Sequence, residues 1–167
     1  MSRPMADAGT VPMSDPLAYF LTWTTYGTWL PGDTRGWVKE REGFRLPDRR
    51  IEHEARRKLV ETPCILDASQ RRLVEETIRR HCEIRGWNLL AIACRTNHVH
   101  VVLQSTAKPI AVMNQLKAWC SRRLKERDQS LGVLPLRTRW WTEHGSTRFL
   151  NDEVSLDGAI VYVLEGQ

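Results

Sequence analysis

Two runs of strand-forming residues stand next to each other in the middle of the chain, separated by a short turn. The first run is WNLLAIACRT, residues 87–96, and the second is HVHVVLQS, residues 98–105. Both are rich in aliphatic and β-branched residues, and the turn falls near Asn97, so the pattern predicts two antiparallel strands. Helical patterns flank the pair, which indicates a sheet covered by helices.

The elements on either side complete a βαββαβ order. Residues 18–25 predict a first strand, and residues 48–61 predict a short charged helix. Asp67 caps a predicted helix that ends at Arg85 before Gly86, and Pro109 opens another that runs to Arg127. Residues 137–150 predict a fourth strand with a loop, and residues 154–167 a terminal helix. This order predicts an α+β fold, a ferredoxin-like sandwich with an antiparallel sheet, helices on one side and a C-terminal helix.

The size and composition of the chain fit a single domain. Its 167 residues, 41% of them hydrophobic, can build one core. Residues 1–16, rich in Pro, Ala, Ser and Gly, predict a disordered lead, and residues 17–167 a single domain. The four cysteines form no CxxC pair, as expected of reduced thiols in a cytoplasm. No apolar run is long enough for a signal sequence or a membrane span, so we expect a cytoplasmic protein without membrane contact.

The second central run carries two histidines around a single valine. Successive side chains of a strand point to opposite faces, so His98 and His100 share one face while Val99 points to the other. With helices on one side only, the pair is expected on the open face of the sheet. Two neutral imidazoles can begin a divalent metal site that needs a third ligand. Two structural or surface histidines are the alternative, and for an isolated HxH they are the commoner case.

The terminal helix places a tyrosine away from its own core face. On a helical wheel, one stripe collects Leu156, Ile160, Val163 and Leu164, and Tyr162 lies about 200° from Ile160. Such a tyrosine is either an amphipathic residue at a helix edge or a phenol available to attack a metal-bound phosphate. An ordinary tyrosine titrates near pH 10, so this second role needs a nearby cation or base.

Three segments together resemble a known family. The segments TNHVHVVL and TWTTYGTWLPGDTRGW, with a tyrosine in a terminal helix, are similar to the REP-associated tyrosine transposases. These belong to the single-tyrosine HUH transposases of bacterial insertion sequences. The resemblance implies a metal-dependent single-strand DNA endonuclease and ligase that cuts and rejoins DNA beside hairpins formed by palindromic repeats. It further implies that His98 and His100 bind Mg2+ or Mn2+, and that Tyr162 attacks phosphorus to leave a 5′-phosphotyrosine.

The sequence departs from this family at the third metal ligand. Relatives commonly place a polar third ligand, often glutamine, four residues after the tyrosine, whereas this chain has Gly166 there. Gln167 matches the residue type and is slightly favoured, because glycine lets the helix unwind. Glu165 is the charged alternative, since it shares a helical face with Tyr162.

Basic and aromatic residues suggest where DNA could bind. A net charge of +5 permits a polyanionic partner. Arg122 and Arg123 near the end of the second long helix, with Arg139 further on, form a candidate phosphate-binding patch or a solvated helix end. Trp29, in a glycine-rich loop with Arg35, either stacks on unpaired bases or anchors its loop.

Two other functions remain open at this point. One is a domesticated protein that binds DNA or RNA hairpins without cutting them. The other is a metal-dependent phosphodiesterase that uses His144 as a further ligand and water as the nucleophile. Relatives act as monomers or as dimers with exchanged tyrosines, so a homodimer is one option.

Overall fold

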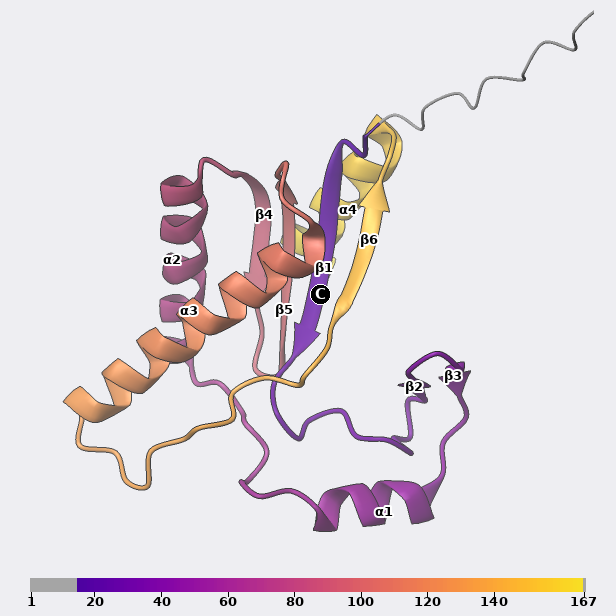
Figure 1. Ribbon diagram of the computed structural model, residues 1–167, viewed down its shortest axis with the longest axis vertical. Coiled ribbons are helices and arrows are strands. Elements are labelled where there is room, and N and C mark those ends of the chain that lie inside the picture. Colours follow the sequence, from indigo (N-terminus) through magenta and orange to yellow (C-terminus); the bar gives the residue numbers. More distant parts are fainter. Residues whose placement is uncertain (1–14, 167) are drawn as a thin grey trace, which may run out of the picture.

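The structure, a computed structural model, describes residues 15–166 (Figure 1). Almost all of the predicted lead at 1–16, together with the candidate ligand Gln167, lies outside this range. The strands and helices are β1 (Ala18–Thr24), β2 (Trp37–Lys39), β3 (Gly43–Arg45), α1 (Arg49–Arg57), α2 (Ala68–Arg85), β4 (Asn88–Cys94), β5 (His98–Gln104), α3 (Pro109–Ser130), β6 (Ser146–Leu150) and α4 (Glu153–Glu165).

Four strands form an antiparallel sheet in the order β4-β5-β1-β6. The predicted α+β fold with a central antiparallel sheet is therefore confirmed. The fourth strand is shorter than predicted, because only 146–150 pairs along β1 and Trp141 makes a single isolated bridge. The Lys117 ammonium donates to the carbonyl oxygens of Thr142, Glu143 and His144, which holds this stretch in a loop beside α3.

The helices α2 and α3 cover one face of the sheet (Figure 1). Asp67 caps α2 with its side chain and Gln70 closes a capping box, while Gly86 ends the helix at a φ of 68°. Buried side chains from these helices and from β1, β4 and β5 form the larger core. Within residues 15–166, none of the helices combines the length and apolar character that crossing a membrane requires.

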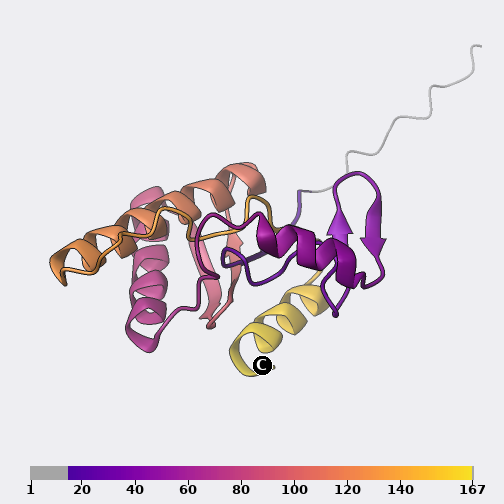
Figure 2. The same ribbon diagram turned by 90° about the horizontal axis from the view of Figure 1, so that it is seen from below.

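The second face of the sheet is covered as well, which corrects the expectation of an open face. Figure 2 shows α4 on the side of the sheet opposite α3. Ala159 and Val163 of α4 are buried against a smaller apolar cluster of the sheet: Ala18, Ala91, Ala93, Val102 and Leu150. Small alanines on the strands let the helix approach closely. Leu164, expected in the core stripe, is 57% exposed.

A small hairpin and α1 project from the end of the sheet (Figure 1). The strands β2 and β3 were not predicted from the sequence, because each has only three residues and follows a glycine-rich loop. The loop before this hairpin is joined to the start of α1, because the Asp48 N–H donates to the Gly32 carbonyl oxygen. The φ of Gly32 is +86°, and a Cβ there would collide with the backbone of Asp48 and Glu52, so only glycine permits the contact.

Candidate active site

The two histidines of β5 lie side by side on the face covered by α4. Their ring centroids are 4.7 Å apart, as the alternation of the strand predicted. The β1–β5 register sets Thr22 opposite His100 and Thr24 opposite His98. Thr22 Oγ1 lies 2.7 Å from His100 Nδ1, which leaves Nε2 as the nitrogen of His100 that can bind a metal.

Asn97 orients the other ring. Its Oδ1 lies 2.7 Å from Nδ1 of His98. A carbonyl oxygen only accepts, so this bond puts the hydrogen on Nδ1 and the lone pair on Nε2. A metal-binding histidine ordinarily has its second ring nitrogen held in this way. The chemistry of both rings therefore fits a divalent cation.

The environment keeps His100 neutral. Its side chain is 7% exposed, and burial, followed by the nearby His98 and Arg95, lowers the pKa of His100 to about 4. A neutral imidazole retains the lone pair that coordination requires. Phe20 packs against the same ring at a centroid distance of 5.4 Å and closes the apolar side of the site.

The helix α4 brings Tyr162 to this pair within a single chain. The Tyr162 and His100 ring centroids lie 5.6 Å apart, and Phe20 lies 6.1 Å from the tyrosine. Tyr162 is 48% exposed, and its phenol oxygen makes no hydrogen bond to the residues described by the structure. A half-exposed phenol beside two imidazoles is placed to meet a phosphate that approaches from solvent.

The third ligand does not emerge from residues 15–166. In that range no group of three His, Cys, Asp or Glu side chains could hold a metal ion, so neither Glu165 nor His144 joins the histidine pair in such a group. Gln167 lies outside the described residues and stays a prediction. Gly166 donates its N–H to the Tyr162 carbonyl and caps α4 four residues after the tyrosine.

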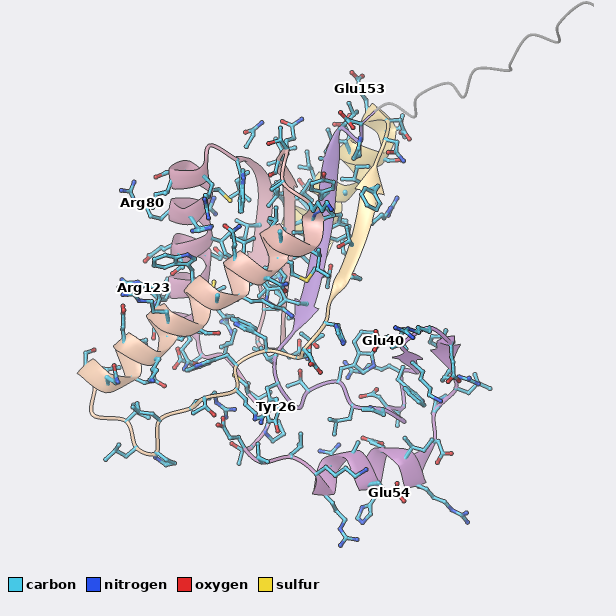
Figure 3. All side chains as sticks on the ribbon, in the orientation of Figure 1. Tyr26, Glu40, Glu54, Arg80, Arg123 and Glu153 are labelled. Carbon is cyan, nitrogen blue, oxygen red and sulfur yellow. The ribbon has the colours of Figure 1, made fainter. Side chains whose placement is uncertain are left out.

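The other predicted binding residues divide into two regions. Trp29 and Arg139 line one groove of the protein. Arg35 bonds both carboxylate oxygens of Asp33 and lies 5.8 Å from the Trp29 ring centroid, so it also belongs to that region. Arg122 and Arg123 are ion-paired with Glu126 on α3. Figure 3 places Arg123 on the side of the molecule away from Tyr26 and Glu40, which line the groove.

Three residues of the site region were not predicted from the sequence: Thr22, Phe20 and Lys117. The first two act by lying beside His100, which depends on the register of β1 against β5. No local pattern reveals that register. Lys117 falls on the inner side of α3 among apolar residues, where an isolated lysine in a core stripe is the only available signal.

The site combines a histidine pair on an antiparallel sheet with a tyrosine supplied by the C-terminal helix. The sequence profile of the family described as Transposase IS200 like matches residues 54–155, most of the described domain. The chain belongs to this transposase family, and the resemblance recognised in the sequence is confirmed.

A solved structure shares the fold of this chain. The chain is similar to a REP-associated tyrosine transposase solved with a REP hairpin, at 10% identity and a TM-score of 0.50, over 98% of this chain and 70% of that chain. At this identity the likeness establishes a shared fold. A Deinococcus radiodurans R1 protein described as a transposase has 15% identity and a TM-score of 0.45, over 94% and 92% of the two chains, and adds nothing further. No curated protein gave a significant match.

Proposed function

We propose that this transposase-family protein cleaves and rejoins single-stranded DNA beside hairpins, with Tyr162 as the nucleophile. The observation that carries the proposal is the 5.6 Å approach of the Tyr162 ring to His100, which joins α4 to β5 in one chain. Membership of the IS200-like transposases supports it, as does the shared fold with a transposase that was solved with a REP hairpin. The same approach favours a tyrosine that acts within its own chain.

The chemical step exchanges one phosphodiester for another. The phenol oxygen of Tyr162 attacks phosphorus, the bond from phosphorus to the 3′ oxygen breaks, and a tyrosyl ester of the 5′ phosphate forms. The phenol loses its proton and the departing 3′ oxygen gains one. The new ester conserves the energy of the broken bond, so the 3′ hydroxyl of another strand can reverse the step without a nucleotide cofactor.

His98 and His100 would hold Mg2+ or Mn2+, with Gln167 as the proposed third ligand. The donor set fits, because each ring has a partner at Nδ1 and His100 is neutral. When bound, the cation would neutralise negative charge on the phosphodiester and favour attack by phenolate. Thr22 and Asn97 hold the rings in orientation, and Phe20 limits water on the sheet side of the site.

A phosphodiesterase that uses water predicts a different set of essential residues. In that mechanism His144 completes the metal site and Tyr162 is dispensable. His144 lies in the loop before β6, and within residues 15–166 it forms no metal-binding group with the pair. A hairpin-binding protein that has lost activity would instead need neither histidine for its task. The tyrosine mechanism therefore accounts for more of the site.

His100→Ala and His144→Ala distinguish these functions. With a labelled hairpin carrying single-stranded flanks and Mn2+, His100→Ala should lose cutting at least about 100-fold, because it removes a proposed metal ligand. Hairpin affinity should stay within about threefold, since phosphate and base contacts lie elsewhere. His144→Ala should cut normally. Loss of cutting in His144→Ala alone would contradict the tyrosine mechanism, and intact DNA with the wild-type protein would favour a binding function.

A further inference from the structure

A groove of about 1010 Å³ lies between the end of the sheet and the hairpin–α1 region. Its walls come from the loop after β1, the start of the β2–β3 hairpin, one side of α3 and the segment that leads into β6. Figure 3 labels Tyr26 and Glu40, which come from two of these walls. Five of the seven tryptophans of the chain line it: Trp23, Trp29, Trp37, Trp140 and Trp141.

Three of the five groove tryptophans are fixed through their ring N–H groups. Trp29 donates to the Gly36 carbonyl at 2.7 Å, Trp37 to the Leu46 carbonyl at 3.2 Å and Trp141 to the Lys117 carbonyl at 3.1 Å. With these donors engaged by backbone, the rings offer their faces and not their polar edges. Trp29 is the most open of them, at 41% exposure. A fixed, exposed indole face stacks on any nucleobase.

Cations stand over the aromatic rings at the edge of the groove. Arg139 lies 6.0 Å from the centroid of the Tyr26 ring, and its guanidinium forms no hydrogen bond or ion pair with the residues the structure describes. Arg35 lies over Trp29 but is bound to Asp33, which fixes its position. An exposed arginine beside stacking faces suits a backbone phosphate between bases. A proline-rich peptide is the alternative ligand for aromatic faces, but it has no negative charge to pair with Arg139.

The groove and the candidate active site share two residues of β1. Thr22 and Thr24 line it, and the same two residues pair with His100 and His98 across the strands. Thr24 Oγ1 also contacts Thr142 Oγ1 at 3.0 Å, which ties the loop before β6 to this strand. A DNA strand that runs from the histidine pair along β1 would therefore pass the two threonines that border the groove.

We propose that this groove binds the unpaired nucleotides next to the cleaved phosphate, with a base stacked on Trp29 and a phosphate at Arg139. The proposal rests on the proposed function for the identity of the strand as DNA. It adds a specific place where the single-stranded flank is held, separate from the hairpin and from the reacting atoms.

Binding without cleavage tests the groove by itself. In EDTA, the full chain is titrated with a labelled hairpin that carries an unpaired flank and with the same hairpin lacking it. Trp29→Ala should weaken binding of the flanked hairpin about 10-fold, because a stacking surface is lost, and change the other by less than about twofold. Trp119→Ala, which removes a 42% exposed tryptophan on α3 outside the groove, is the matched control. Equal effects of Trp29→Ala on both hairpins, or none, would overturn the proposal.

A second measurement avoids any loss of folding in the variant. With 5-iodouracil in the unpaired flank, irradiation of the wild-type complex should attach DNA to the peptide that contains Trp29. Attachment elsewhere, including the Trp119 peptide, would contradict the groove assignment. Because neither experiment needs cutting, discrimination of the flank without cleavage would reject the proposed function but keep the groove. Cleavage without any preference for the flanked hairpin would keep the proposed function and reject the groove.

Discussion

At the residue scale, the candidate site depends on side chains that orient the histidines as much as on the histidines themselves. Thr22 contacts His100 Nδ1 at 2.7 Å from the neighbouring strand. The threonine hydroxyl thus determines which nitrogen of His100 faces the proposed metal. Partners of this kind ordinarily change metal affinity 10- to 100-fold when removed.

Thr22→Val should therefore weaken Mn2+ binding about 10-fold, since it removes the hydroxyl and keeps the branched shape. Thr22→Ser restores the hydroxyl and should bind within about threefold of wild type. Calorimetric titration of Mn2+ into DNA-free protein measures this without recourse to activity. Equal affinities of the Val variant and the wild type would reject a positioning role for Thr22.

At the element scale, glycine stabilises the C-terminal end of α2 but destabilises the interior of α4. Gly86 ends α2 at a φ of 68°, in the left-handed region that other residues adopt at a cost. Gly158 lies within α4, is exposed, and has no atom within 4 Å of where a Cβ would sit. Glycine within a helix lowers stability relative to alanine.

Gly158→Ala should accordingly raise the free energy of unfolding by about 1 kcal/mol, while Gly86→Ala should lower it by about 1 kcal/mol. Urea unfolding of the two variants beside the wild type measures both values. A destabilised Gly158→Ala variant would mean that α4 does not pack as described.

Local sequence patterns predicted the positions of helices and strands better than the packing between them. Asp67, Gly86 and Pro109 marked helix ends correctly, because capping and the fixed φ of proline are local effects. The alternation of β5 correctly placed both histidines on one face. The second covering helix was not predicted, because the packing of α4 on the alanines of β1 and β4 involves residues far apart in the chain. The short β2–β3 hairpin was missed for lack of any alternating run.

At the scale of the whole molecule, the core holds four thiols in their neutral form. Cys64, Cys82, Cys94 and Cys120 are all free and buried. Burial raises the pKa of Cys82 to about 11 and that of Cys94 to about 12, and it raises the pKa of Cys120 well above the ordinary value. Burial also lowers the pKa of Lys117 to about 8. Because of these shifts, the free energy of unfolding should change with pH in the alkaline range.

The fold should lose stability steeply above about pH 9. Each thiol has a folded pKa above its unfolded value of 9.0, so its contribution is complete below that pH and is lost as pH rises. Cys82 and Cys94 together lower the free energy of unfolding by about 3 kcal/mol per pH unit between about pH 9 and 11. Lys117, whose folded pKa lies below its unfolded value of 10.5, offsets about half of this loss up to that pH. Urea midpoints at about pH 8 and about pH 10 measure the effect, and equal midpoints would contradict it.

The central claim is that Tyr162 forms a covalent bond to DNA beside the histidine pair. After incubation with Mn2+ and a hairpin labelled on the strand 3′ to the cleavage point, the denatured wild-type protein should carry the label. Tyr162→Phe should carry none and should fold normally, because the ring keeps its contacts with His100 and Phe20. Tyr19→Phe, a matched loss of one phenol oxygen on β1, should label as wild type does. Continued cutting by Tyr162→Phe, or label retained by that variant, would contradict the account.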